Sequence, residues 1–183
     1  MKRKQNPQGF HKRGGGRAGN PSQLQAIRET LQSGNYSGAL TTINDALATA
    51  SGAGSKSLLL SLAGDCLFRQ GKFAEAAELY GETLATVQTE PTYWLRPALG
   101  EIQSLLKGAQ VEAAQAKAAA ALEIANGFHS QYQALLTQAQ SVVTAGGQVA
   151  IPAEPPPPAK VASRLGKIFF SEGEVTTAKS LFQ

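Results

Sequence analysis

The chain of 183 residues has one cysteine and two histidines, so it offers little for thiol or imidazole catalysis. Its single cysteine, Cys66, cannot form an internal disulfide, and as a thiolate nucleophile it would need a histidine beside it. His11 lies in the N-terminal segment and His129 more than one predicted helix away. The sequence shows no paired carboxylates, phosphate-binding loop or metal-ligand cluster. We therefore expect a buried core cysteine and a protein without enzymatic activity, cofactor or metal.

Charge is the more informative chemistry, because it is unevenly distributed. Residues 1–20 contain six of the 17 basic residues and none of the 13 acidic ones, which leaves 11 basic against 13 acidic residues in the rest. The formal charge of +4 is therefore a property of this segment. Its three consecutive glycines and single aromatic residue predict a disordered arm. The basic residues of the arm are Lys2, Arg3, Lys4, Lys12, Arg13 and Arg17.

Two interpretations of the arm stay open. It could contact RNA or another polyanion, in which case binding would be non-specific and strongly salt-dependent. Alternatively, it could be a solvated leader that only keeps the protein soluble. No apolar segment follows the first basic residues, and no apolar run approaches the roughly 18 residues of a membrane span. We therefore expect a cytoplasmic protein with no membrane association.

The elements that carry these charges are predicted to be helices, because apolar residues recur at intervals of three and four. Asn20-Pro21 has the N-cap and first-turn proline of a helix start. Asn126-Gly127 is expected to end the sixth helix, and Pro97 either kinks the fifth helix or marks its real start. The seventh helix is expected to cap the array. The predicted helices span residues 21–33, 37–50, 55–70, 72–88, 91–107, 110–125 and 128–144.

Two helix pairs share one spacing of small residues. Gly64, Gly71 and Ala76 in the first pair correspond to Gly166, Gly173 and Ala178 in the second. A small residue lets two helices cross closely, and a turn glycine can take the left-handed conformation that ends a helix. Weaker copies surround Gly34 and Gly108, each interpreted as a turn glycine. Larger residues fill the space around the small contacts: Leu60, Leu67, Tyr80, Leu165, Phe169 and Phe182.

This spacing resembles the tetratricopeptide repeat (TPR), a helix–turn–helix unit of about 34 residues. The slots of its pattern fall on Leu60, Gly64, Leu67, Ala76 and Tyr80. The resemblance implies an all-α, right-handed superhelix of antiparallel helix pairs with a concave inner face. It divides the chain into a basic arm (residues 1–20), three helix pairs with a capping helix (21–145), a Gly/Pro-rich linker (146–158) and an incomplete hairpin (159–183).

The resemblance implies a non-catalytic scaffold or adaptor that binds a partner peptide or protein in the concave groove. Phe68 and Phe170 occupy the same slot of their repeats, and both could equally belong to the core between repeats. The residues expected to face the groove from the first helices are Arg28, Gln32, Asp65, Phe68, Arg69, Glu101, Lys167 and Phe170.

One subset of the family holds an acidic C-terminal peptide with basic side chains on the inner helices. Here Asp65 stands at an inner position and would repel a carboxylate. The last hairpin offers Lys160, Arg164 and Lys167 at helical spacing, with a solvated face as the alternative interpretation. Two further functions stay open: polyanion binding through the arm, and service as the regulatory arm of a larger enzyme, since the last hairpin stops short of a full unit.

Overall fold

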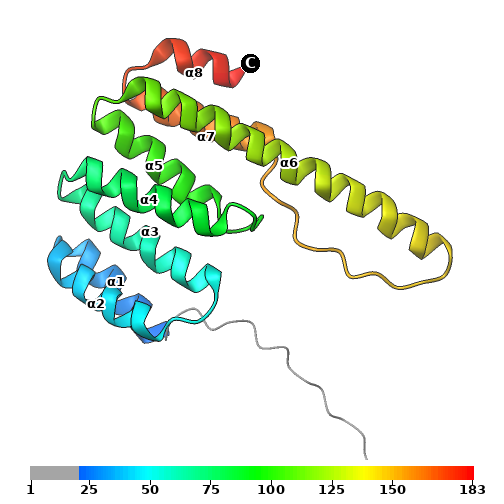
Figure 1. Ribbon diagram of the computed structural model, residues 1–183, viewed down its shortest axis with the longest axis horizontal. Helices are drawn as coiled ribbons and strands as arrows, with labels where there is room; N and C mark the ends of the chain where they lie inside the picture. The colour runs from blue at the N-terminus through cyan, green and yellow to red at the C-terminus, as the bar shows by residue number, and fades with distance from the viewer. Residues whose placement is uncertain (1–20) are drawn as a thin grey trace, which may run out of the picture.

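The computed structural model describes residues 21–183, which form eight α-helices and no strand (Figure 1). The all-α expectation is therefore confirmed for this part of the chain. None of its helices is long and apolar enough to cross a membrane. The helices are α1 (Pro21–Gln32), α2 (Tyr36–Thr49), α3 (Ala53–Arg69), α4 (Phe73–Val87), α5 (Leu95–Lys107), α6 (Val111–Thr144), α7 (Pro158–Ser171) and α8 (Val175–Phe182).

Consecutive helices pair as hairpins, α1–α2, α3–α4, α5–α6 and α7–α8, which stack in chain order (Figure 1). Gly34, Gly71 and Gly173 close three of them in the left-handed conformation, with φ of +78°, +77° and +87°. At the α3–α4 turn the N–H groups of Gly71 and Lys72 donate to the carbonyls of Phe68 and Leu67, both at 3.0 Å. This pair of bonds closes the last turn of the helix on its own carbonyls.

The α5–α6 turn departs from the prediction by one residue. The sequence placed the turn glycine at Gly108, but the residue in the left-handed conformation is Ala109, with φ of +58°. The N–H groups of Ala109 and Gln110 donate to the carbonyls of Leu106 and Leu105, as in the other hairpins. An alanine in this conformation costs about 1–2 kcal/mol, so this turn is strained where the others are relaxed.

Helix α6 is one continuous element of 34 residues, so the expected break at Asn126-Gly127 and the separate helix from residue 128 are wrong. Ala125 and Phe128, on either side of the glycine, are both buried, and the Phe128 ring lies 6.0 Å from that of Trp94. Burial of these side chains offsets the roughly 1 kcal/mol that glycine costs in a helix. The outer half of α6 therefore projects past its neighbours, while α7 packs on the inner half and on α5 (Figure 1).

Three helices of the described chain have a proline in the first turn, the first being α1, which begins at Pro21. Pro97 lies in the first turn of α5, which selects the second of the two alternatives for this residue, and Pro158 opens α7. A first-turn proline is tolerated because the N–H it lacks would have no partner within the helix. The connection between α6 and α7 loops back from the tip of α6 to reach this proline (Figure 1).

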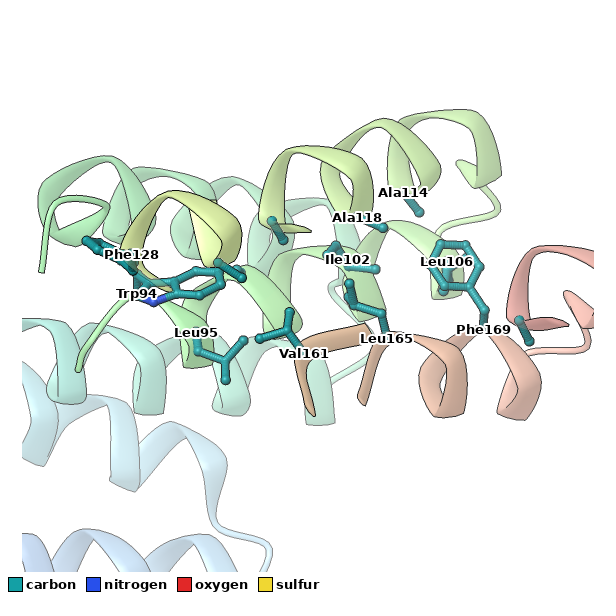
Figure 2. Packing of buried hydrophobic residues seen from close by; sticks show 14 residues of the cluster. Trp94, Leu95, Ile102, Leu106, Ala114, Ala118, Phe128, Val161, Leu165 and Phe169 are labelled. Carbon is teal, nitrogen blue, oxygen red and sulfur yellow. The ribbon is translucent and has the colours of Figure 1, made fainter. Parts of the chain in front are cut away.

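The core consists of two apolar clusters. One joins α1, α2 and α3 around Ile27, Ile43 and Cys66. The other joins α5, α6, α7 and α8 around Trp94 and Phe169 (Figure 2). Of the residues predicted to pack the repeats, Leu60 and Leu67 are half-buried, Phe182 is exposed, and the following are buried: Gly64, Ala76, Tyr80, Leu165, Gly166, Phe169 and Ala178.

Tyr80 shows why glycine is needed at these positions. Its ring lies against both Gly64 of α3 and Gly100 of α5. A Cβ atom added to either glycine would approach the ring to 2.7 Å at Gly64 and 2.6 Å at Gly100, closer than packed atoms allow. The predicted close approach at Gly64 is therefore confirmed, and the group that fills the space is the aromatic side chain from α4.

Candidate functional site

A groove of about 760 Å³ crosses the first helices of the stacked hairpins, and we refer to it as the concave groove. Its lining includes the buried Tyr80 and the half-buried Gly100, and it combines apolar with charged residues. Six helices supply its polar and aromatic side chains: Gln32 from α1, Tyr36 from α2, Asp65, Phe68 and Arg69 from α3, Tyr80 from α4, Arg96 and Gln103 from α5, and Arg164 from α7.

Helical spacing explains why these side chains face the same way. On α3, Asp65, Phe68 and Arg69 stand at positions i, i+3 and i+4, which share one face of a helix. On α5, Arg96 and Gln103 are two turns apart on the face that also carries Gly100. Sequence reasoning missed both α5 residues, although their spacing would have indicated them once the helix start was placed at Leu95.

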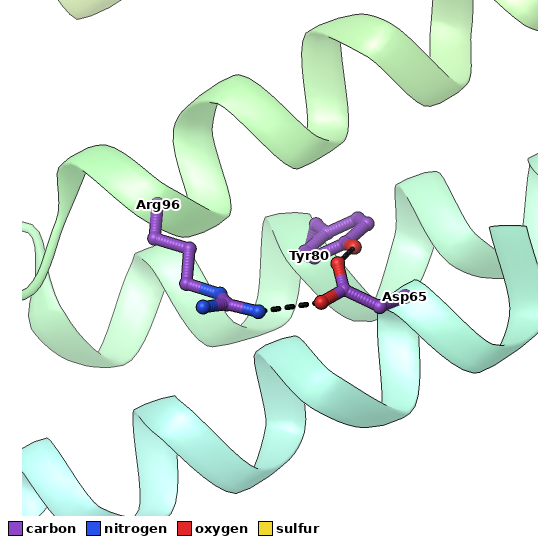
Figure 3. A network of polar contacts seen from close by, with 3 residues as sticks. All are labelled: Asp65, Tyr80 and Arg96. Atoms are coloured by element: carbon purple, nitrogen blue, oxygen red, sulfur yellow. Dashed lines mark hydrogen bonds and ion pairs between the residues drawn. The ribbon is translucent and has the colours of Figure 1, made fainter. Parts of the chain in front are cut away.

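Asp65, Tyr80 and Arg96 form a network in the lining of the groove (Figure 3). The Arg96 guanidinium Nη2 lies 2.5 Å from Asp65 Oδ2, and the Tyr80 hydroxyl donates to Asp65 Oδ1. Burial of the ring, followed by the nearby Asp65 charge, raises the pKa of Tyr80 well above its usual range. The hydroxyl therefore stays protonated and serves as a donor.

This network changes the electrostatic expectation for Asp65. The sequence predicted that its carboxylate would repel an anionic ligand, but both of its oxygens have donors and Arg96 compensates its charge. The lining then holds three arginines, Arg69, Arg96 and Arg164, against this one acidic residue. Within residues 21–183, Arg69 and Arg164 form no ion pair with a carboxylate. The groove is thus positive although this part of the chain has 11 basic and 13 acidic residues.

Four of the eight residues predicted to face the groove do line it: Gln32, Asp65, Phe68 and Arg69. The Phe68 ring is half-buried and meets the edge of Phe73 at 5.2 Å, so it belongs to the groove wall and to the packing within its hairpin. A half-buried ring can offer one apolar face to a ligand while the other remains packed.

The other four predicted residues lie elsewhere. Glu101 is buried, and its Oε1 is 2.6 Å from Lys117 Nζ of α6, because it is about 100° around the helix from Gly100. Arg28 is exposed on α1, and Lys167 and Phe170 are exposed on α7, outside the groove lining.

Of the three basic residues predicted to hold an acidic peptide, two line a common hollow and the third does not. Lys160 and Arg164 line a hollow of about 420 Å³ between α7 and the proline segment, together with Glu154. Arg164 also lines the concave groove, so the two hollows adjoin there. Lys167 is exposed and lines neither of them.

Cys66 is fully buried, as expected for a core residue. Burial, with a further contribution from Asp65, raises the pKa of its thiol to about 11, so the neutral form predominates at physiological pH. Across residues 21–183, no group of three or more His, Cys, Asp and Glu side chains is arranged to hold a metal ion. The predicted polyanion-contact residues, Lys2, Arg3, Lys4, Lys12, Arg13 and Arg17, lie outside the residues that the structure describes.

Comparison with protein-family models gives no match for this chain, and comparison with curated proteins gives none either. The features that bear on function are therefore the groove geometry and the repeat spacing.

Proposed function

We propose that this protein is a non-catalytic scaffold that binds a partner protein through the concave groove, and that the groove takes a peptide segment carrying carboxylates. The observation that supports this most is the charge of the lining, where Arg96 compensates Asp65 and two arginines, Arg69 and Arg164, remain without an ion-pair partner in residues 21–183. The TPR-like spacing supports the same function, since arrays of this kind bind peptides along their concave face.

Each part of the groove has a role in this proposal. Arg69 and Arg164 offer planar guanidinium groups, which can hold a carboxylate through two parallel hydrogen bonds. Phe68 offers an apolar surface for a side chain between two acidic positions. Gln32 and Gln103 can each donate to and accept from a peptide backbone. The separation of these groups over four helices suits an extended or helical segment better than a small molecule.

A binding experiment with defined peptides tests the proposal. The probes are two fluorescein-labelled peptides of equal length, one alternating Glu and Leu and the other alternating Lys and Leu, and the readout is fluorescence anisotropy. We expect the acidic peptide to bind and the basic one not to bind. Arg69→Glu should weaken binding of the acidic peptide about tenfold, because a charged hydrogen bond is replaced by repulsion.

Two control proteins test whether the loss of affinity is specific to the groove. Arg28→Glu makes the same change at an exposed arginine outside the groove lining and should leave the affinity unchanged. A protein that lacks residues 2–20 should bind as the full chain does. If binding disappears with residues 2–20, the basic arm is the anion-binding element and the groove proposal fails; equal losses from Arg28→Glu and Arg69→Glu would also refute it.

A further inference from the structure

Hairpin α7–α8 repeats the register of α3–α4 but lacks the helix that covers it. The left-handed turn glycines Gly71 and Gly173 align the two hairpins, and in this alignment Phe182 corresponds to Tyr80. In the first hairpin α5 packs on both helices and brings Gly100 against the Tyr80 ring. Within residues 21–183 no helix takes the equivalent place over α8, which is the last element of the stack (Figure 1).

Four side chains define the face that such a helix would cover, and we refer to it as the end face. Val175, Lys179 and Phe182 stand at positions i, i+4 and i+7 of α8, which share one side of a helix. Lys167 joins them from α7, where it follows Gly166. All four are exposed, although the Phe182 ring lies on Gly166. Neither lysine forms an ion pair with a carboxylate within residues 21–183, so the end face is both apolar and positive.

The contacts of α8 with α6 lie on the other side of the helix. Gln115 of α6 donates a hydrogen bond to Thr177, and Ala178 and Leu181 belong to the core cluster beneath α8. Thr177 is about 140° around the helix from Phe182. Helix α6 therefore leaves the end face open.

The residue that follows the close-approach glycine has opposite charge in the two hairpins. In α3 it is Asp65, after Gly64, and Arg96 of α5 binds its carboxylate (Figure 3). In α7 it is Lys167, after Gly166. A helix that covered α7–α8 as α5 covers α3–α4 would therefore need an acidic side chain in the place of the arginine.

The spacing on α5 gives a sequence pattern for the covering helix. Arg96 precedes Gly100 by four residues, which places both on one side of α5. The first binds Asp65 and the second lies against Tyr80. The matching pattern for the end face is Asp or Glu followed four residues later by Gly or Ala, with the small residue against Phe182.

We propose that the end face binds an amphipathic, acidic helix of a partner protein, which continues the stack as α5 continues it from α3–α4. Lys167 pairs with the acidic residue of the pattern, and Phe182 becomes enclosed. Lys179 supplies a second positive charge, at the position that the buried Ala77 occupies in α4. A symmetric contact between two copies is disfavoured, because it would bring the lysines of both end faces together.

Two fluorescein-labelled peptides with the sequence of residues 93–108 test the proposal by fluorescence anisotropy with the full chain. One is unmodified and the other carries Arg96→Glu. We expect the Arg96→Glu peptide to bind about tenfold more tightly, because its carboxylate meets Lys167 whereas the arginine is repelled. Lys167→Glu in the protein should reverse this preference. Lys56→Glu makes the same change at an exposed lysine of α3 and should leave both affinities unchanged.

Two further variants separate packing from charge and the end face from the concave groove. Phe182→Ala should weaken binding of the Arg96→Glu peptide about tenfold, because the ring is enclosed only in the complex. Circular dichroism verifies that this variant keeps its helix content. Arg69→Glu, which weakens peptide binding in the concave groove, should leave the affinity unchanged, because Lys167 and Phe182 do not line that groove. This proposal and the proposed function therefore fail separately.

Four results would overturn the proposal. The first is no binding of the Arg96→Glu peptide, or equal affinities for the two peptides. The second is an equal effect of Lys167→Glu and Lys56→Glu. The third is a dimer of the full chain in sedimentation equilibrium that Phe182→Ala abolishes, which would assign the end face to a second copy. The fourth is binding of a labelled oligouridine that Lys167→Glu abolishes, which would assign it to nucleic acid.

Discussion

Hairpins α3–α4 and α7–α8 are built on the same plan but differ in what covers them. In both, an aromatic residue of the second helix lies on a glycine of the first: Tyr80 on Gly64 and Phe182 on Gly166. A Cβ added to the glycine would meet the ring at 2.7 Å in the first hairpin and 2.6 Å in the second. Yet Tyr80 is 3 % exposed and Phe182 is 53 % exposed.

The difference comes from the next hairpin along the stack. Tyr80 is enclosed because Gly100 of α5 approaches its other face, whereas no helix in the described chain lies beyond α8. A hairpin of this type therefore sets the geometry of the aromatic contact by itself but gains most of its burial from its neighbour. This is the behaviour expected of a stacked array, in which stability is largely a property of the interfaces between units.

Truncating the two aromatic residues should give the largest contrast between the hairpins. Tyr80→Ala removes an enclosed ring and should lower the free energy of unfolding by about 3–5 kcal/mol. Phe182→Ala removes a ring that is half in solvent and should cost less than about 1 kcal/mol. Urea denaturation followed by the fluorescence of Trp94, the single tryptophan, measures both. Losses of similar size would contradict the role of the covering helix.

Adding a methyl group to the paired glycines should change stability in opposite directions. In Gly64→Ala the new Cβ meets a ring that cannot move, so the clash outweighs the higher helix propensity of alanine and the net loss should be about 1–2 kcal/mol. In Gly166→Ala the exposed Phe182 ring can rotate away, which leaves a gain of up to about 1 kcal/mol. Thermal unfolding measures the change in stability of the two variants. A loss of stability in both would show that Phe182 is held as firmly as Tyr80.

High pH should lower the free energy of unfolding through Tyr80 of the first hairpin, whereas its counterpart in the second hairpin, Phe182, has no group to ionise. The folded-state pKa of Tyr80 is raised, so its stabilising contribution is complete below the unfolded value of about 10 and decreases as the pH rises further. The free energy of unfolding should fall by up to about 1.4 kcal/mol per pH unit above pH 10 from this group. Cys66, whose pKa is also raised, contributes in the same direction.

The control for this titration is Tyr80→Phe, which gives the first hairpin the residue type of the second. Its unfolding free energy, measured in urea at a series of pH values above 9, should fall less steeply than that of the unmodified protein. Equal slopes for the two proteins would mean that Tyr80 ionises as readily in the folded state as in the unfolded state.

The smallest expected effect concerns the hairpin turns. Ala109→Gly relieves a left-handed alanine and should raise the free energy of unfolding by about 0.5–1 kcal/mol, after allowance for the greater freedom of glycine in the unfolded chain. Gly71→Ala introduces the same strain elsewhere and should lower the free energy by about 1 kcal/mol. Differential scanning calorimetry detects both shifts, and a loss of stability in Ala109→Gly would refute the assignment of strain to this turn.

The sequence was sufficient for features that depend on neighbouring residues. The first four helices, the left-handed turns at Gly34, Gly71 and Gly173 and the close approach at Gly64 were all predicted from local spacing, and the structure confirms them. These features follow from the conformational freedom of glycine and from the periodicity of apolar residues.

Features that depend on distant residues were not predictable in this way. Gly127 continues a helix because Ala125 and Phe128 are buried beside it, and burial is decided by the whole fold. Arg96 joins the groove through an ion pair with Asp65, 31 positions earlier in the sequence. Glu101 faces away from the groove, about 100° around α5 from Gly100, and its burial there depends on the ion pair with Lys117 of α6. In each case a partner brought close only by the fold determines the outcome.

Chemical-shift mapping tests whether the concave groove is a binding surface for acidic segments. ¹⁵N-labelled full-length protein is titrated with the alternating Glu-Leu peptide, and backbone amide shifts are followed by NMR. The groove account predicts that the largest changes cluster at Phe68, Arg69, Gln103 and Arg164, which come from three different helices but share one surface. Changes confined to residues 2–20, or spread evenly over the helices, would contradict it.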